Sequence, residues 1–399
     1  MLSWSSRTFC LGCVLIVPMV LPAQVTNGKK PDLPPPFATK SSPNPPEETK
    51  PPGDFLPIVP DGFKVSVFAR DFKEPRWLTV APNGDIFLAD SGAGTIFILR
   101  SSQKPGTAGL ADVFAKGLNR PFGIAFHDNY VYVGDTDAVL RFPYDPKTSK
   151  RMGESEKLMT LPHGGHWTRG LAFSPDGKHL FVSIGSSSNI DIETDAHRAA
   201  VTICDPDGKN ARLYATGLRN PVDIAFEPTT GQLWASINER DGLVDDLPPD
   251  YFTSVKEGGF YGWPYSYIGD NVDPRVKPQR PDLVAKAIVP DVLLGAHRAP
   301  LQFVFYNGKQ FPERYHGGVF LAEHGSWNRS LRVGYQLVFI PFADGKPSGD
   351  PQPFLTGLVP DPSKSVVNGR PVGVTVAPDG SLLISDDAAG VIYRVSAGR

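Results

Sequence analysis

Six arginines recur along this chain, each at the start of a short apolar stretch. They are Arg76, Arg120, Arg169, Arg219, Arg298 and Arg370. A guanidinium presents a planar fork of donors that suits carboxylates and phosphates. Several such groups at one place favour an anionic ligand, for example a polycarboxylate. Each arginine taken singly has an equally ordinary structural interpretation, in which it binds the loop carbonyls of a neighbouring unit.

A histidine precedes the third of these arginines by three residues. The text is His163-Gly-Gly-His166-Trp-Thr-Arg169. Imidazole is the side chain best suited to proton abstraction near neutral pH, and the positive charge of Arg169 would favour its neutral form. On spacing alone, a structural role for His166 in a loop or core is also open. Asn220, directly after Arg219, adds a polar group at the next unit.

The arginines mark an internal repeat. Each opens a unit of apolar strand, turn and second strand, and the turns include Pro-Asn-Gly and Pro-Asp-Gly, which are typical of hairpins. The first three spacings, 44, 49 and 50 residues, match the blade length of propeller families. The last two, 79 and 72 residues, indicate insertions in blades four and five. Inserted loops tend to gather on one face, where function also gathers.

Each unit is expected to hold four strands with one buried face. A segment resembling a fourth strand, residues 63–69, stands before the first arginine, and the sixth unit lacks one after Val395. The sequence therefore predicts an all-β, six-bladed propeller over residues 61–399, closed by an N-terminal strand that hides two sheet edges.

Two segments precede the predicted propeller. Residues 1–23 have the basic and apolar regions of a secretory signal peptide. A membrane anchor or a lipoprotein signal at Cys13 is the alternative. Residues 24–60 are rich in proline and polar residues, which predicts a disordered, semi-rigid linker. We therefore expect an exported, periplasmic or secreted protein, at most peripheral to a membrane.

Composition bounds the partners. Removal of the signal peptide would leave Cys204 alone, so no intrachain disulfide framework is expected. The net charge of −2 gives no electrostatic footprint for nucleic acid. No CxxCH haem motif occurs in the chain, so a haem carrier of electrons would be a separate protein.

The chain resembles the PQQ-dependent glucose/sorbosone dehydrogenase family, and most closely its sorbosone-dehydrogenase-like branch. The resemblance spans essentially the whole predicted propeller. It rests on the ordered combination of the following stretches: His163-Gly-Gly-His-Trp-Thr-Arg169, Gly217-Leu-Arg-Asn-Pro221, Asn238-Glu-Arg-Asp-Gly242, Asp246-Leu-Pro-Pro-Asp-Tyr251, Tyr261-Gly-Trp-Pro264, Glu323-His-Gly-Ser-Trp-Asn-Arg329 and Gly369-Arg-Pro-Val-Gly373.

The resemblance implies pyrroloquinoline quinone (PQQ) at the channel mouth and a calcium ion that polarises it. His166 resembles the base that takes the sugar hydroxyl proton, with Arg169 beside it. The residues expected to hold the quinone are Arg219, Asn220, Arg370, Asn328, Arg329 and Arg120. The main-chain carbonyls of Gly262 and Pro264 resemble the calcium ligands, in keeping with the preference of calcium for oxygen.

One departure from the family concerns the histidine. The soluble glucose enzymes place an acidic residue after the second strand of this blade to orient it, whereas this chain has Ile184-Gly-Ser-Ser-Ser-Asn189. Asp191 or Glu193 would have to reach back, or the histidine has no carboxylate partner.

The expected function is a PQQ- and calcium-dependent dehydrogenase that oxidises a sugar or a sugar-derived aldehyde and passes electrons to a separate cytochrome or quinone acceptor. Two rivals remain at this point. One is a calcium-dependent lactonase built on Asn220, Asn238, Glu239 and Asp386, since such enzymes gather acidic and amide groups around an axial metal. The other is a propeller that binds without catalysis, because fold does not determine function.

Overall fold

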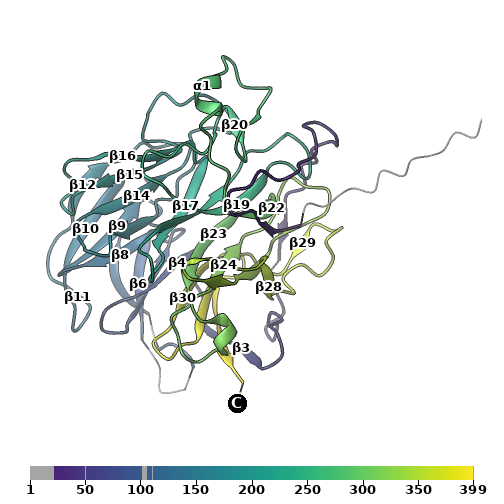
Figure 1. Cartoon of the computed structure of the whole chain (residues 1–399). Coiled ribbons are helices and arrows are strands. Elements are labelled where there is room, and N and C mark those ends of the chain that lie inside the picture. Colours follow the sequence, from purple (N-terminus) through teal and green to yellow (C-terminus); the bar gives the residue numbers. More distant parts are fainter. Residues whose placement is uncertain (1–21, 50, 101–105, 110, 399) are drawn as a thin grey trace, which may run out of the picture.

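The computed structural model describes residues 22–49, 51–100, 106–109 and 111–398. Residues 1–21, with nearly all of the expected signal peptide, lie outside the described residues. Six antiparallel sheets dominate the fold (Figure 1). Their innermost strands neighbour one another in the order β4, β8, β13, β17, β23, β30 and back to β4. This closed ring confirms the predicted six-bladed propeller.

Blades one to three each carry four main strands in chain order. Blade one consists of β4 (Pro75–Val80), β5 (Ile86–Asp90), β6 (Thr95–Leu99) and β7 (Asp112–Lys116). Blade two consists of β8 (Ile124–His127), β9 (Tyr130–Asp135), β10 (Ala138–Asp145) and β12 (Glu156–Thr160), with β11 (Lys150–Arg151) on β10. Blade three consists of β13 (Leu171–Phe173), β14 (Leu180–Ile184), β15 (Ala200–Cys204) and β16 (Arg212–Thr216).

Blades four to six follow the same plan with additions. Blade four consists of β17 (Asn220–Phe226), β18 (Leu233–Asn238), β19 (Pro249–Ser254) and β22 (Val292–Ala296), with β1 (Gln24–Val25) on β22. Blade five consists of β23 (Pro300–Phe305), β24 (Val319–Glu323), β25 (Gln336–Ile340) and β28 (Gln352–Leu355). Blade six consists of β30 (Pro371–Val376), β31 (Leu382–Asp386), β32 (Val391–Ala397) and β3 (Phe63–Arg70).

The remaining elements are short. They are the pairs β20 (Ser266–Tyr267) with β21 (Asn271–Val272), β26 (Phe342–Ala343) with β27 (Lys346–Pro347), and β2 (Glu47–Glu48) with β29 (Val366–Val367), the helix α1 (Pro281–Val284) and the 3₁₀ turn η1 (Glu313–Tyr315). Among the described residues, no helix has the length and apolar character needed to cross a membrane.

The ring closes as the sequence predicts. Strand β3 pairs antiparallel with β32 from Phe63 opposite Ala397 to Arg70 opposite Val391. This pairing joins the start of the propeller to its end, so the last blade is completed by a strand that precedes the first. Closure of this kind satisfies two sheet edges that would otherwise be open to pairing with other chains.

Glycines allow the inner strands to approach one another. A Cβ at Gly123 would lie 2.4 Å from the Arg169 carbonyl oxygen, and one at Gly373 would lie 2.3 Å from the Arg76 carbonyl oxygen. The backbones of neighbouring blades therefore touch directly at these points, which a larger residue would prevent. Beside them, apolar side chains that follow the repeat arginines or their neighbours meet in one buried cluster, including Trp77, Phe122, Val222, Leu301 and Val372.

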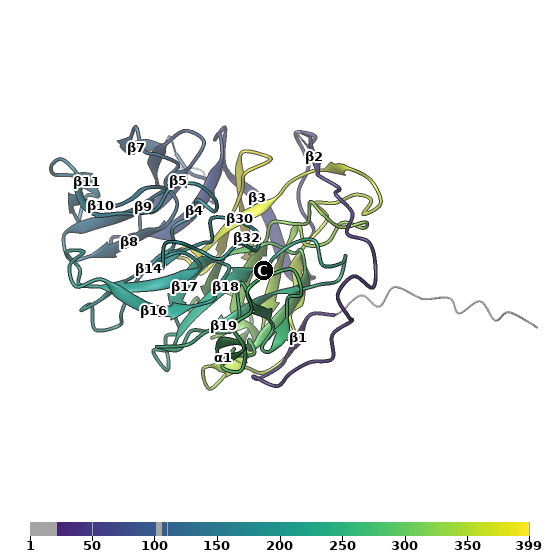
Figure 2. The same ribbon diagram turned by 90° about the horizontal axis from the view of Figure 1, so that it is seen from above.

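The proline-rich segment pairs with the propeller at two places. It runs in an extended conformation over blades four to six, between β1 on β22 and β2 on β29 (Figure 2). Asn44 fastens it further, because the Arg332 guanidinium donates to the Asn44 carbonyl and to its side-chain oxygen, both at 2.9 Å. Proline prevents this segment from forming a sheet of its own, but it leaves the carbonyls free to accept hydrogen bonds from the propeller.

Candidate active site

The predicted chemistry-bearing residues lie at the ends of strands on one side of the ring. His166 precedes β13 in blade three, while Arg219 and Asn220 stand at the start of β17 in blade four. A Cβ at Gly185 would lie 2.6 Å from the His166 Cβ and 2.3 Å from the Asn220 Oδ1. The bare backbone of Gly185 therefore brings the histidine and the asparagine together, as the resemblance implies.

His166 is held through one ring nitrogen. Its Nδ1 lies 2.9 Å from the Ser186 carbonyl oxygen and 3.1 Å from the Ser186 Oγ. The Ser186 hydroxyl already donates to the Ser188 carbonyl at 2.6 Å. Both neighbours of Nδ1 therefore act as acceptors, which assigns the proton to Nδ1 and leaves the lone pair on Nε2. Within the described chain, Nε2 makes no hydrogen bond, so it is available to take a proton from a ligand.

No carboxylate orients this histidine. Glu193 instead binds the backbone N–H and the hydroxyl of Ser187, at 2.5 and 2.8 Å. Asp191 contributes its backbone N–H to the Ser188 hydroxyl at 2.8 Å. A main-chain carbonyl thus does the orienting that an acidic residue performs in the soluble glucose enzymes. The sequence shows that the acidic residue is absent, but it does not show that the Ser186 carbonyl takes its place.

The environment keeps His166 neutral. Burial and then the neighbouring Arg219 charge lower the pKa of His166 to about 4, and Arg198 acts in the same direction. From the sequence we expect Arg169 to lower the pKa of His166, but Arg169 is not among the groups that shift it. A neutral imidazole over the whole neutral range is the form that a general base requires.

Arg169 has a structural place instead of a catalytic one. It is fully buried, and its guanidinium donates to the carbonyls of Pro162, His166 and Thr168 at 2.7 to 2.8 Å. Arg198, which sequence reasoning missed, similarly binds the carbonyls of His163 and Gly164. The two arginines fix the loop that carries His166. For Arg169, these contacts match the ordinary structural interpretation of a repeat arginine.

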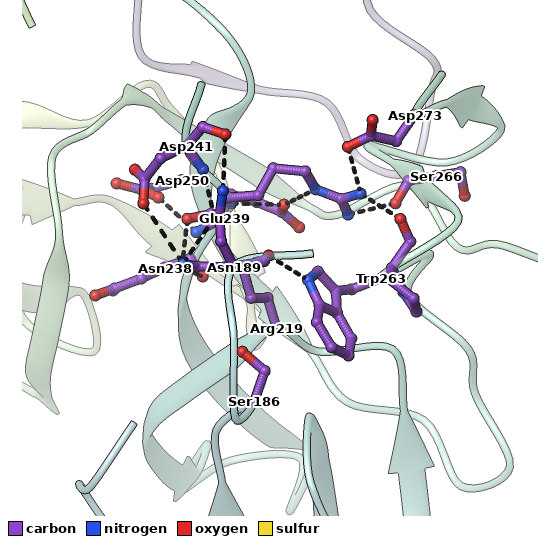
Figure 3. Close-up of polar contacts among 12 residues, drawn as sticks. Ser186, Asn189, Arg219, Asn238, Glu239, Asp241, Asp250, Trp263, Ser266 and Asp273 are labelled. Carbon is purple, nitrogen blue, oxygen red and sulfur yellow. Dashed lines mark hydrogen bonds and ion pairs between the residues drawn. The ribbon is translucent and has the colours of Figure 1, made fainter. Parts of the chain in front are cut away.

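Arg219 and Asn189 form the centre of a polar network (Figure 3). The Arg219 Nε and Nη2 bind the backbone and side-chain oxygens of Asn189 at 3.2 and 3.1 Å, and Nη1 donates to the Glu239 carbonyl at 2.7 Å. Asn189 also accepts from the Asp241 N–H at 2.9 Å. These contacts hold the guanidinium of Arg219 rigidly beside His166, with its charge only partly balanced by Asp241 at 3.5 Å.

Asn220 carries an unfilled acceptor. Its side chain is buried, and its Oδ1 has no hydrogen-bond partner among the described residues. Burial of an amide oxygen without a partner costs about 1–3 kcal/mol. Such a group beside a neutral histidine indicates a place where a ligand donor or a water molecule completes the site.

Asn328 and Arg329 lie in the same region but bind different carboxylates. The Asn328 amide donates to the Asp241 carboxylate at 2.5 Å, while Arg329 pairs with Asp246. Asp241 also lies 3.4 Å from the His297 Nδ1, and the His297 Nε2 lies 3.2 Å from the Val244 carbonyl oxygen. Burial would lower the pKa of His297, but the contact with Asp241 outweighs it and raises the pKa.

The expected calcium ligands are already engaged. The Gly262 carbonyl accepts from the Ser266 N–H at 2.9 Å. The Pro264 carbonyl accepts from the Arg240 Nη1 at 2.6 Å, and Arg240 is fully buried. That guanidinium is itself paired with Glu239 and Asp273. Each of these carbonyl oxygens has a second lone pair, so the assignment of Gly262 and Pro264 as calcium ligands stays a prediction.

The insertion in blade four nevertheless serves the site. The insertion contacts blade three, where Phe260 forms a parallel β-bridge with Thr216. The Trp263 indole then donates to the Asn189 carbonyl at 3.0 Å. The predicted insertion thus supports the Arg219 network through Trp263.

The other repeat arginines are dispersed around the ring. Arg120 lies 3.8 Å from the centre of the Trp167 ring and pairs with Glu74 at 3.1 Å. Arg370 pairs with Glu48 of the N-terminal segment at 3.0 Å. An anionic ligand at Arg370 would therefore meet the charge of Glu48, a contact that no sequence pattern indicates.

The lactonase alternative gains no support from the geometry. Among the described residues, no three His, Cys, Asp or Glu side chains gather as a metal site. The Glu239 carboxylate binds Arg240 at 3.0 Å, and the Asp386 Oδ1 accepts from the N–H groups of Arg370 and Ala389, both at 2.9 Å. These acidic groups serve the protein's own backbone and cations.

A six-bladed propeller with a neutral histidine, a buried arginine and an asparagine at the ends of blades three and four defines the structural class. Within that class, the chain belongs to the TrAA12-like family, whose model matches residues 57–251 and 279–398.

Three relatives illustrate the similarity. An uncharacterized protein of Borreliella burgdorferi is 32% identical over an alignment of 352 residues that covers 84% of this chain and 90% of that protein. The pyrroloquinoline quinone-dependent pyranose dehydrogenase of Coprinopsis cinerea is 23% identical over 84% of this chain. The match covers 54% of that enzyme, so this chain spans about half of its length. The aldose sugar dehydrogenase YliI of Escherichia coli is 25% identical over 60% of this chain and 62% of that enzyme.

Solved structures share the fold. The holo form of the pyranose dehydrogenase PQQ domain from Coprinopsis cinerea superposes with a TM-score of 0.75 at 21% identity, covering 87% of this chain and 98% of that domain. A calcium structure of a Trichoderma reesei family AA12 enzyme gives a TM-score of 0.74 at 21% identity, over 86% and 97% of the two chains.

Proposed function

We propose that this chain is a PQQ-dependent oxidoreductase that oxidises a sugar or a sugar-derived aldehyde of the glucose/sorbosone type. The observation that carries the proposal is the pairing of a neutral His166, open at Nε2, with the unfilled Asn220 acceptor beside it. Relatives named as PQQ-dependent pyranose and sugar dehydrogenases support the same conclusion.

The residues around the ring fit an anionic quinone. Arg219 is fixed beside His166, while Arg370 and Arg120 lie at the strand ends of blades six and two, paired with Glu48 and Glu74. The Arg298 Nε is buried without a partner among the described residues. PQQ carries three carboxylates, which guanidinium groups suit. When bound, the quinone supplies the hydride acceptor, because this is chemistry that protein side chains lack.

His166 would act on the substrate hydroxyl. Its Nε2 takes the hydroxyl proton while the hydrogen on the same carbon leaves with two electrons, and a C=O bond forms. Arg219 holds the imidazole neutral through its charge, and Ser186 fixes the tautomer. For an aldehyde substrate, the hydrate offers the same hydroxyl. The substrate class and this role for His166 are parts of the proposal.

Calcium enters the proposal with the Gly262 and Pro264 carbonyls as its ligands, because each accepts one hydrogen bond and keeps a second lone pair. Export and a separate electron acceptor, a cytochrome or a quinone, complete the proposed function. They follow from the apolar N-terminal residues and from the chain's lack of a CxxCH motif.

The test is reconstitution. Purified chain is titrated with PQQ, with calcium and with chelator in separate arms, and dye reduction is followed over a panel of aldoses, ketoses and sugar aldehydes. We expect PQQ to bind and at least one sugar to reduce the dye. Binding of PQQ without turnover of any sugar or aldehyde would overturn the substrate class. Absence of PQQ binding in all arms would overturn the oxidoreductase assignment.

A further inference from the structure

A second histidine, His324, lies at a strand end and, like His166, has one ring nitrogen bound and the other without a hydrogen bond among the described residues. His324 follows β24 in blade five, and its Nε2 lies 3.0 and 3.1 Å from the two carboxylate oxygens of Asp387 in blade six. The resembling stretch Glu323-His-Gly-Ser-Trp-Asn-Arg329 contains this histidine. Neither the sequence argument nor the proposed mechanism gives it a role.

Asp387 fixes the tautomer of His324. An ionised carboxylate only accepts hydrogen bonds, so Nε2 carries the proton and Nδ1 carries the lone pair. Burial would raise the pKa of Asp387, but His324 and Arg76 outweigh it and lower the pKa. The Arg76 guanidinium pairs with the same carboxylate. Asp387 therefore has a cationic partner of its own and does not need His324 for charge balance.

The surroundings also favour a neutral ring. Burial and then the nearby Arg370 charge lower the pKa of His324 to about 4. The charged groups near the ring are Asp387, Arg76 and Arg370, and Glu48 lies on the far side of Arg370. The His324 Nδ1 makes no hydrogen bond within the described residues, although the side chain is 14% exposed.

One cation–π contact, one ion pair and one hydrogen bond link this group to the first histidine. Trp167, the residue after His166, has the guanidinium of Arg76 5.2 Å from its ring centre. Arg76 then contacts Asp387, and Asp387 contacts His324. The two imidazoles are therefore connected across blades three, one, six and five through adjoining side chains.

We propose that His324 is a second ligand-binding imidazole of this site, whose Nδ1 accepts a hydrogen bond from a ligand O–H or N–H group, with Asp387 as its positioning residue. The inference rests on the proposed function, because that function names the two ligands, a sugar and PQQ, that carry an O–H or N–H donor. A sugar supplies it through a hydroxyl, and PQQ supplies it through its ring N–H. A carboxylate does not, because it would place lone pair against lone pair.

The first experiment measures binding in three variants. His324→Phe keeps a ring and removes both nitrogens. Asp387→Asn keeps the shape but lets an amide donate to Nε2, which moves the proton to Nδ1. His316→Phe is the control, since His316 is tied to the Phe311 carbonyl at 2.9 Å within blade five. PQQ affinity is measured by titration of apoprotein, and sugar affinity is measured as KM against kcat in the holoprotein.

Loss of one neutral hydrogen bond corresponds to an affinity loss of about 3- to 10-fold. We expect His324→Phe and Asp387→Asn to show it for one of the two ligands, and His316→Phe for neither. A raised Kd for PQQ assigns the donor to the quinone, and a raised sugar KM with unchanged PQQ affinity assigns it to the sugar. Unchanged values for both ligands would overturn the inference while leaving the proposed function intact.

A second experiment uses the wild-type protein and measures no enzymatic activity. Nitrogen-15 spectra of histidine-labelled wild-type apoprotein distinguish a ring nitrogen with a lone pair from one with a proton. We expect His324 to show a protonated Nε2 and a bare Nδ1, and the Nδ1 resonance to shift when PQQ or a sugar binds. A protonated Nδ1, or a bare Nδ1 that no ligand shifts, would overturn the inference even if the chain proves to have no PQQ-dependent activity.

Discussion

The state of His166 leads to a quantitative prediction about the pH dependence of catalysis. With a pKa of about 4, His166 is about 97% neutral at pH 5.5, whereas an ordinary imidazole of pKa 6.5 would be about 9% neutral. The pH profile of kcat/KM reports the free enzyme. We therefore expect activity to persist well below pH 6.5 and to fall only as pH approaches 4, provided that no second group titrates first.

The matching variant is His166→Ala. Alanine keeps the Cβ that packs against Gly185, and it leaves the contacts of Arg219 with Asn189 and Glu239 untouched. Removal of a general base typically costs a factor of about 100 to 10,000 in rate. We expect a loss of that size in the rate at which sugar reduces the bound quinone, measured in a single turnover, with PQQ affinity little changed.

Arg370→Ala provides the complementary control. It removes a cation from the opposite side of the ring without touching His166, so it should weaken PQQ binding and be largely rescued by excess PQQ. The reasoning is refuted if His166→Ala retains near-normal single-turnover rates, or if the acid limb of kcat/KM in the wild type lies near pH 6.5. In either case the base is another group, or Arg219 and burial do not lower the pKa as described.

Three further predictions concern stability. Arg240→Met should lower the free energy of unfolding by about 3–5 kcal/mol, because it leaves Glu239 and Asp273 buried without their partner. Urea denaturation measures this, with the exposed Arg280→Met as control, and a loss below about 1 kcal/mol would contradict it. Deletion of Phe63–Arg70 should prevent folding, since it opens blade six; deletion of residues 24–49 should leave a folded but less stable ring by circular dichroism. Finally, the pKa values of His166 and His324 are lowered to about 4, so the stability that they contribute is complete above pH 6.5 and is lost as pH falls through 4. In the double variant His166→Ala/His324→Phe, the loss between pH 7 and pH 4 should shrink by about 2–3 kcal/mol per histidine, and an unchanged pH dependence of the urea midpoint would exclude this.

The architecture was predictable because the repeat is local in sequence. Each blade is one supersecondary unit with its own turn signals, so arginine spacing and strand alternation determine the number of blades and their boundaries. The closing pair β3–β32 was also predictable, because a fourth strand was missing at one end of the repeat and in excess at the other. The N-terminal segment was not, since its order comes from contacts with residues such as Arg332, almost 300 positions away.

The site divides in the same way. Composition and motif order picked out His166, Arg219 and Asn220, which the fold does bring together around Gly185. The sequence could not decide which guanidinium faces a ligand and which holds a loop, because all six arginines occupy the same position in the sequence repeat. Arg169 is enclosed by three carbonyls, whereas Arg120 lies on a tryptophan ring at the surface.

Residue types and their spacing therefore determined the ring, its closure and the identity of the first histidine. Tertiary structure decided the rest, because protonation and ligand capacity depend on distances between blades. The Ser186 carbonyl binds His166, Arg240 donates to the Pro264 carbonyl, and Asp387 reaches His324 from the next blade. Each of these contacts joins segments whose separation along the chain carries no signal, and each depends on burial that only the packed ring provides.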